Sequence, residues 1–218
     1  MDLVTMAASG HFTKAFQPEK KIPQSDIETL LAFMYSIPAS VNVQPYHYIV
    51  ISSEAGKQRI VKDMKGGAEM NIPKVRDTSH TIIFCTRLDV PEGHMQRIHE
   101  LELQHGRFRP QDIERWTEVA DGFVAFRRNG LKDLFHWMEK QTYMALGMTL
   151  MAANMLDINV SPLEGFDKAA VDKEFGLTEK GFTSTVLLGL GYRDVPHDFL
   201  VNLPKSRLPK NEIFEFID

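Results

Sequence analysis

The sequence predicts an α+β fold in which a central mixed β-sheet is flanked by helices. Three apolar runs rich in β-branched residues indicate buried strands over residues 46–51, 81–85 and 185–190. The segments between them are longer and carry apolar residues at helical intervals, but they do not alternate with the strands in a regular βαβ rhythm. Because no repeat, low-complexity run or Gly/Ser linker interrupts the chain, one domain over residues 1–218 is expected.

Two helices and an extended stretch are expected before the first strand. A short helix over residues 2–9 is followed by an extended segment over residues 11–16. Residues 25–28 have the spacing of a capping box, and apolar residues then recur at helical intervals, so a helix is expected from residue 25 towards Pro38. A polar loop between Pro38 and Pro45 leads into the first strand. Such a loop is well placed to face a ligand.

The rest of the chain is predicted to be mostly helical. Ser53 is placed to cap a helix that runs to Met64, and the two glycines that follow end it. Further helices are expected over residues 91–105, 111–128 and 131–156. After the last strand, a second extended segment over residues 213–216 closes the chain.

Composition excludes several classes of protein. The 25 Lys and Arg residues against 29 Asp and Glu residues give a net charge of −4, which argues against a binder of nucleic acid. The one cysteine, Cys85, can form neither an intrachain disulfide nor a cysteine zinc site. With no secretory signal at the N-terminus, a cytoplasmic location is expected. The longest uncharged apolar stretch, residues 142–156, is too short to cross a membrane.

Motifs of the common nucleotide and hydrolase sites are missing. Residues 189–191 lack the third glycine of a dinucleotide fingerprint, and the sequence holds neither a P-loop nor a G-x-S-x-G elbow. His94, His99 and His105 do not share a helical face at a distance that suits one metal ion, so no metal site is expected. Cys85 lies in an apolar strand, where a thiol is usually a small core residue.

A group of cations and carboxamides in loops remains. Residues 202–210 carry three cations and no acid, and two prolines stiffen this segment, so Lys205 and Arg207 suit one phosphate group. The alternative is an ordinary solvated loop. Asn42 and Gln44 can read a planar ring with alternating donors and acceptors, although asparagine in loops also serves turn formation. Together these residues favour a phosphorylated planar cofactor that carries the chemistry itself.

Five short motifs occur in the order and spacing of one known family. They are Thr13-Lys14-Ala15-Phe16, Ser40-x-Asn42-x-Gln44-Pro45, Asn71-x-x-Lys74, Pro162-x-Glu164-Gly165-Phe166 and Pro204-Lys205-Ser206-Arg207-Leu208-Pro209. With these motifs the chain resembles the FMN-dependent nitroreductase superfamily from residue 2 to about residue 209. The resemblance implies an α+β fold and an intertwined homodimer, with two FMN sites at the interface and C-terminal extensions that embrace the partner.

The resemblance also implies which residues bind the phosphate end and the pyrimidine edge of FMN. Lys205 and Arg207 would hold the phosphate, and His11 would line the phosphate and ribityl region. Lys14 and Lys74 would lie near the pyrimidine edge of the ring. Cations at this edge stabilise the negative charge of the reduced flavin, so the protein would act mainly through electrostatics.

Other motif residues would contact the flavin ring itself. Asn71 would hydrogen-bond the pyrimidine edge, and the turn that begins at Pro162 would cover one face of the ring. The backbone N–H of Glu164 or Gly165 in this turn would point towards N5. Three residues would reach a flavin bound mainly by the other subunit, namely Ser40, Asn42 and Gln44.

Several positions depart from the family pattern. Gly10 stands where the family usually has Arg, and Phe12 stands where it has Ser, so one cation and one hydroxyl are missing on the phosphate side. The expected substrate side is wider and more apolar than in relatives. The residues expected to bind substrate are Val41, Ala68, Met70, Phe123 and Val124.

The resemblance implies an FMN-dependent NAD(P)H oxidoreductase that reduces nitroaromatics, quinones or pterins. A hydride would pass from NADH or NADPH to flavin N5, and the acceptor would then replace the nicotinamide in a ping-pong cycle. No side chain needs to act as a nucleophile, so no catalytic residue is assigned. Two alternatives stay open: a flavin or ene reductase of the same fold, and a non-catalytic or flavin-poor relative with a decayed site.

Overall fold

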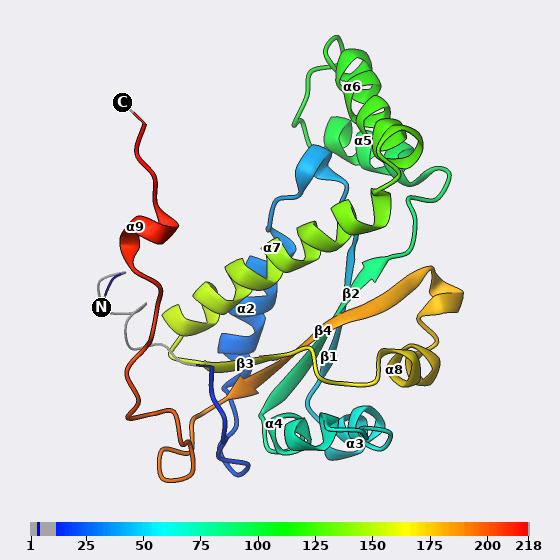
Figure 1. Cartoon of the computed structure of the whole chain (residues 1–218). Coiled ribbons are helices and arrows are strands. Elements are labelled where there is room, and N and C mark those ends of the chain that lie inside the picture. The colour runs from blue at the N-terminus through cyan, green and yellow to red at the C-terminus, as the bar shows by residue number, and fades with distance from the viewer. Residues whose placement is uncertain (1–3, 5–11, 218) are drawn as a thin grey trace.

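Figure 1 shows a computed structural model of the chain, which describes residue 4 and residues 12–217. The strands are β1 (Tyr46–Ile51), β2 (His80–Arg87), β3 (Asn159–Leu163) and β4 (Phe182–Gly191). The α-helices are α2 (Gln24–Tyr35), α3 (Glu54–Val61), α4 (Pro73–Arg76), α5 (His94–Gln104), α6 (Ile113–Ala125), α7 (Leu134–Met155), α8 (Lys168–Phe175) and α9 (Lys210–Ile213).

The strands within residues 12–217 form one four-stranded sheet in the order β1-β2-β4-β3. Each of the three neighbouring pairs is antiparallel. The predicted α+β class is confirmed, but the expected mixed sheet is corrected to an antiparallel one. The reason is the strand order: β2 and β3 run in the same direction, but β4 lies between them, so these two strands cannot pair.

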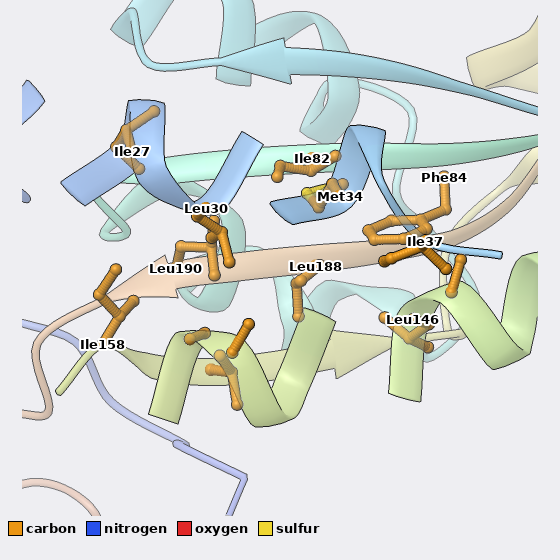
Figure 2. Close-up of a cluster of buried hydrophobic side chains, with 14 of the residues drawn as sticks. Ile27, Leu30, Met34, Ile37, Ile82, Phe84, Leu146, Ile158, Leu188 and Leu190 are labelled. Carbon is orange, nitrogen blue, oxygen red and sulfur yellow. The ribbon is translucent and has the colours of Figure 1, made fainter. Parts of the chain in front are cut away.

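One face of the sheet is covered by α2 and α7. Successive side chains of a strand point to opposite faces, so Ile82 and Phe84 of β2 lie on the same side. They pack with Leu30 of α2 and Leu146 of α7 in a cluster of buried side chains (Figure 2). Burying a side chain of this size stabilises the fold by about 1.5–3 kcal/mol, so this layer supports the sheet strongly from this face.

The other face is covered by the short helices α3, α4 and α8. Ile83 and Cys85 of β2 point to this side and pack with Ile60, Val75 and Val171, one from each helix. The prediction that Cys85 is a core residue is confirmed, since its side chain is fully buried. Burial raises the pKa of the Cys85 thiol to about 12, so the group is protonated and unreactive at neutral pH.

A third cluster lies at one end of the sheet, where α5 and α6 project from the body (Figure 1). Met95, Val124 and Trp137 pack there around Val43, which belongs to the loop before β1. This cluster therefore ties the projecting helices to the polar loop that the sequence places before the first strand.

The strands and helices predicted within residues 12–217 all have counterparts there, with shifted ends. Helix α2 begins at Gln24, after Pro23, and the Ser25 hydroxyl bonds Asp26 instead of capping the helix. Helix α3 is capped by Ser53 as predicted, but it ends at Val61 rather than Met64. The helix predicted over residues 2–9 lies outside the described residues, apart from residue 4.

Four of the named elements were not predicted, namely β3, α4, α8 and α9. Strand β3 contains Pro162, and a proline lowers the strand signal of a sequence; β3 is an edge strand, where proline is tolerated. Helix α8 is only eight residues long, and its cap is the Asp167 side chain, which accepts a hydrogen bond of 3.0 Å from the N–H of Ala170. The sequence after Phe166 has little apolar periodicity, so local capping is its main helix signal.

The strand β4 approaches the backbone of α4 at Gly189. A Cβ atom at this position would lie 2.7 Å from the carbonyl oxygen of Lys74 and 2.9 Å from Cγ2 of Thr78. Only a residue without a side chain allows this contact. The position of Lys74 relative to the sheet therefore depends on Gly189.

We predict that Gly189→Ala lowers the free energy of unfolding by about 1–3 kcal/mol, because the added methyl group must push α4 away from β4. Chemical denaturation followed by circular dichroism measures the effect. The control is Gly122→Ala on α6, where an added Cβ has no atom within 4 Å; it should stabilise by about 0.5–1 kcal/mol. Equal stability of the Gly189 variant and the wild type would contradict the proposed contact.

Candidate functional site

Three of the cations predicted to bind the cofactor lie around one cleft. Lys14, Lys205 and Arg207 line a cavity of about 380 Å³. The remaining lining residues are Phe12, Leu200, Leu203, Pro204 and Ser206. Arg207 donates a hydrogen bond of 2.6 Å to the carbonyl of Ser206, which holds its guanidinium beside the cleft. The fold thus brings the segment around Lys14 together with the C-terminal segment that holds Lys205 and Arg207, although the two are almost 200 residues apart in sequence.

A buried carboxylate connects the two segments that form this cleft. Asp198 is only 2% exposed, and it accepts hydrogen bonds from the backbone N–H of Lys14 (3.1 Å) and of Leu200 (3.0 Å). It also pairs with Arg193, whose Nε lies 3.2 Å from the carboxylate. The carboxylate therefore fixes Lys14 next to the tail. Sequence reasoning missed Asp198, because nothing in its local sequence distinguishes it from an ordinary loop aspartate.

A chain of hydrogen bonds joins the second group of predicted residues. Lys74 donates to Oδ1 of Asn71 (2.8 Å), and Nδ2 of Asn71 donates to the carbonyl of Gly165 (2.9 Å). A Cβ atom on Gly165 would lie 2.7 Å from Nδ2 of Asn71, so a side chain at this position would displace the Asn71 carboxamide. These bonds attach Lys74 of α4 and Asn71, which precedes α4, to the turn that follows β3.

The two groups are electrostatically coupled. Burial and the positive charge of Lys14 hold the pKa of the Lys74 ammonium below its ordinary value. The two ammonium groups therefore lie close enough to repel each other. An anion between them would relieve this repulsion, so the arrangement favours a negatively charged ligand.

A tyrosine that sequence reasoning missed supports the same turn. Tyr143 of α7 donates a hydrogen bond of 2.6 Å from its hydroxyl to Oε1 of Glu164. Burial and the neighbouring Glu164 carboxylate raise the pKa of Tyr143, so the hydroxyl keeps its proton and remains a donor. The turn around Glu164 and Gly165 is thus held from both sides. Tyr143 lies in a helix without any motif, which explains why its role had no sequence signal.

The loop over residues 40–44 is strained. Val41, Asn42 and Gln44 have φ angles of 45°, 54° and 41°, in the left-handed region. For residues other than glycine this conformation costs about 1–3 kcal/mol each, and such strain is concentrated at functional sites. The N–H of Ser40 donates to Oε1 of Gln141 on α7 at 3.0 Å, which helps to hold the loop.

This loop is not part of the cationic cleft of its own chain. The Asn42 carboxamide donates to Glu102 of α5, and Gln44 lines a different cleft, beside the edge strand β1. Ser40 is attached to α7 instead. In the described chain, the loop over residues 40–44 and the cationic cleft are therefore two separate surfaces, although the sequence predicts that both bind the cofactor.

The residues expected to bind substrate differ widely in exposure. Met70 is 72% exposed, whereas Val124 is only 4% exposed and packs in the cluster around Trp137. Val41, Ala68 and Phe123 are half-buried. Val124 lies in a different environment from Met70, so these residues do not form one continuous surface within the described chain.

On the phosphate side, the two departures from the family pattern are placed differently. Phe12 lines the cationic cleft and is 48% exposed. Gly10 and His11 lie outside the described residues.

The predicted Pro162 lies in the edge strand β3, opposite Leu188 of β4, and so anchors the turn that leads to Glu164.

Comparison with known proteins agrees with this geometry. Residues 11–192 match the nitroreductase family. The chain is 37% identical to an oxygen-insensitive NAD(P)H nitroreductase of Enterobacter cloacae, over 98% of each chain. It is 29% identical to the major NAD(P)H-flavin oxidoreductase of Aliivibrio fischeri, over 89% of each chain.

Solved structures show the same fold at low sequence identity. A protein assigned as a nitroreductase from Exiguobacterium sibiricum, in complex with FMN, superposes with a TM-score of 0.82 at 20% identity over 100% of this chain and 98% of that one. An enone reductase of gut-bacterial fatty acid metabolism superposes with a TM-score of 0.74 at 15% identity, over 100% of this chain and 98% of that one. No helix among the described residues is long and apolar enough to span a membrane. By its sequence match and its fold, the chain belongs to the nitroreductase family.

Proposed function

We propose that this protein is an FMN-dependent NAD(P)H oxidoreductase. The observation that carries the proposal is the cleft in which Lys14, Lys205 and Arg207 meet, in a protein whose net charge is negative. The names of the relatives support it, since they include an NAD(P)H nitroreductase and an NAD(P)H-flavin oxidoreductase. A related fold has been seen with FMN bound.

The charged and amide side chains of the site suit the chemical groups of FMN. Arg207 offers a planar fork and Lys205 a point charge, which together suit the phosphate dianion. Lys74 and Asn71 supply a cation and a carboxamide for the polar edge of a planar ring. When bound, FMN would supply the transfer of a hydride from NADH or NADPH to an acceptor.

The protein's own residues would then position charge and exclude water. Lys14 and Lys74 would stabilise negative charge on the pyrimidine edge of the ring, because Asp198 holds the backbone of Lys14 and Asn71 holds the ammonium group of Lys74. The turn at Glu164 and Gly165 would cover one face of the ring, since Asn71 and Tyr143 fix it from both sides. No side chain has to act as a nucleophile.

The acceptor is proposed to be a nitroaromatic, a quinone or a pterin. The relatives that the chain resembles include a flavin oxidoreductase and, by fold alone, an enone reductase. A free flavin or an activated alkene is therefore the second class of acceptor to test. A steady-state panel of these acceptors with NADH and NADPH distinguishes them.

We predict that the wild-type protein binds FMN much more tightly than riboflavin, which lacks the phosphate. The double variant Lys205→Ala/Arg207→Ala should weaken FMN binding about 10- to 100-fold for each charged hydrogen bond lost, and should leave riboflavin binding unchanged. Quenching of flavin fluorescence on titration measures both affinities.

Lys210→Ala is the matched control, because Lys210 is an exposed cation of the same segment outside the cleft. It should bind both flavins like the wild type. NADH or NADPH added without oxygen should bleach the bound flavin. Wild-type protein that is colourless and takes up no FMN would overturn the proposal and favour a decayed, non-catalytic relative.

The protein is also proposed to be a homodimer. Met144, Met151 and Met155 lie on one face of α7, and they are 41%, 44% and 77% exposed. A row of exposed apolar side chains on the longest helix is typical of a subunit interface. A second copy would cover it, and would bring the loop over residues 40–44 to the cationic cleft of its partner.

The C-terminal segment supports the same assembly. Phe214, Phe216 and Ile217 are 59%, 89% and 88% exposed, and Figure 1 shows this segment leaving the body of the molecule. Strand β1 is an edge of the sheet, and a cleft of about 580 Å³ lies beside it, lined by side chains that include Tyr46 and Tyr48. The tail of a partner subunit would bury its aromatic side chains in such a cleft.

We predict that the wild type elutes with about twice the monomer mass of 24.9 kDa, and that Met151→Glu dissociates it, because a buried unpaired carboxylate is costly. Size-exclusion chromatography with light scattering gives the mass. Val119→Glu is the control, since Val119 is 54% exposed on α6 and lies outside the proposed interface. A monomeric wild type would contradict the proposal.

A further inference from the structure

The helix α5 contacts two consecutive residues of the strained loop over residues 40–44. Oε1 of Glu102 accepts a hydrogen bond of 2.8 Å from the Asn42 carboxamide. His94, at the other end of α5, donates from Nε2 to the carbonyl of Val43 at 2.7 Å. Asn42 has a φ of 54°, in the left-handed region, and the contact with Glu102 fixes the direction of its carboxamide.

Glu102 is buried and fully engaged. It is only 3% exposed. A carboxylate is stable at such a buried position only when it is paired and hydrogen-bonded, and Glu102 has several partners. Besides Asn42, it accepts from Nε1 of Trp116 on α6 at 3.1 Å, and Arg107 lies 3.4 Å from Oε1. Nδ1 of His99 lies 3.3 Å from Oε2.

These contacts join three separate segments at one carboxylate. His99 also lies 3.2 Å from Asp121 of α6, so the imidazole extends the network to a second carboxylate. The projecting pair of helices α5 and α6 is thereby connected to the loop before β1 through polar groups as well as through the apolar cluster around Val43. A polar network of this kind fixes one arrangement when all its members are satisfied.

We propose that Glu102 is a positioning residue of the cofactor site: it fixes the Asn42 carboxamide and the loop over residues 40–44, so that FMN affinity depends on helix α5. The inference rests on the proposed function, in which this loop reaches the flavin. It adds a residue that lies outside all five sequence motifs and outside the cationic cleft. A role limited to packing α5 against α6 is the competing explanation.

Glu102→Gln tests the proposal. The neutral amide has one acceptor oxygen and cannot satisfy Asn42, Trp116 and Arg107 together, so the FMN dissociation constant should rise about tenfold. Glu100→Gln is the matched control: it makes the same change on the same helix, but Glu100 is exposed, and its hydrogen-bond partners among the described residues are Gln96 and Arg97 of its own helix. Its affinity for FMN should equal that of the wild type.

Glu102→Asp is the second variant. It keeps the buried negative charge, but a side chain shorter by one methylene withdraws the carboxylate from Asn42. FMN affinity should again fall about tenfold, and combining it with Asn42→Ala should cause no further loss, since both changes remove the same contact. Thermal unfolding of each apoprotein is measured in parallel.

The outcomes separate the two proposals. If the wild type binds no FMN, the proposed function fails. If the wild type and Glu100→Gln bind FMN while a folded Glu102 variant binds it equally well, the proposed function stands and the role of Glu102 is refuted. A lower melting temperature with unchanged FMN affinity likewise supports the purely structural explanation. If Glu102→Gln does not fold, the FMN affinities of Glu102→Asp, Asn42→Ala and their double variant decide whether Glu102 acts through Asn42.

Discussion

The contact between β4 and α4 at Gly189 determines where the site is built. The missing side chain lets the strand approach the carbonyl of Lys74, and the lysine is thereby fixed relative to the sheet. From there the hydrogen bonds continue through Asn71 to Gly165, where a side chain would displace the Asn71 carboxamide. The close approach at Gly189 and the Asn71 carboxamide thus connect the Lys74 cation to the turn at Gly165.

Positive charges gather at the site, although the net charge of the protein is negative. Lys14 is fixed through Asp198, which also orients the start of the C-terminal tail with Lys205 and Arg207. Burial and the positive charge of Lys14 both lower the pKa of Lys74, so the fold holds these two cations near each other although they repel. A bound phosphate and the negative pyrimidine edge of a reduced flavin would both relieve this repulsion.

The sequence predicted the layers of the fold and the cationic residues, because both depend on local patterns. The continuous apolar run over residues 81–85 marks a buried strand, and the Pro204 to Pro209 segment marks a stiff basic loop. The antiparallel order of the sheet and the network around Glu102 were not predictable, because they depend on which segments meet after folding. Asp198 and Tyr143 were missed for the same reason: each acts through a residue far away in sequence. The roles of the motif residues remain predictions.

The central claim is that fixed cations stabilise negative charge on the flavin ring. The midpoint potential of bound FMN, measured by spectroelectrochemistry in the wild type and in Lys74→Met, tests it most directly. The account predicts a more negative potential in the variant, because the reduced, negatively charged ring loses a cation that the oxidised ring does not need. An unchanged potential in a variant that still binds FMN would contradict the account.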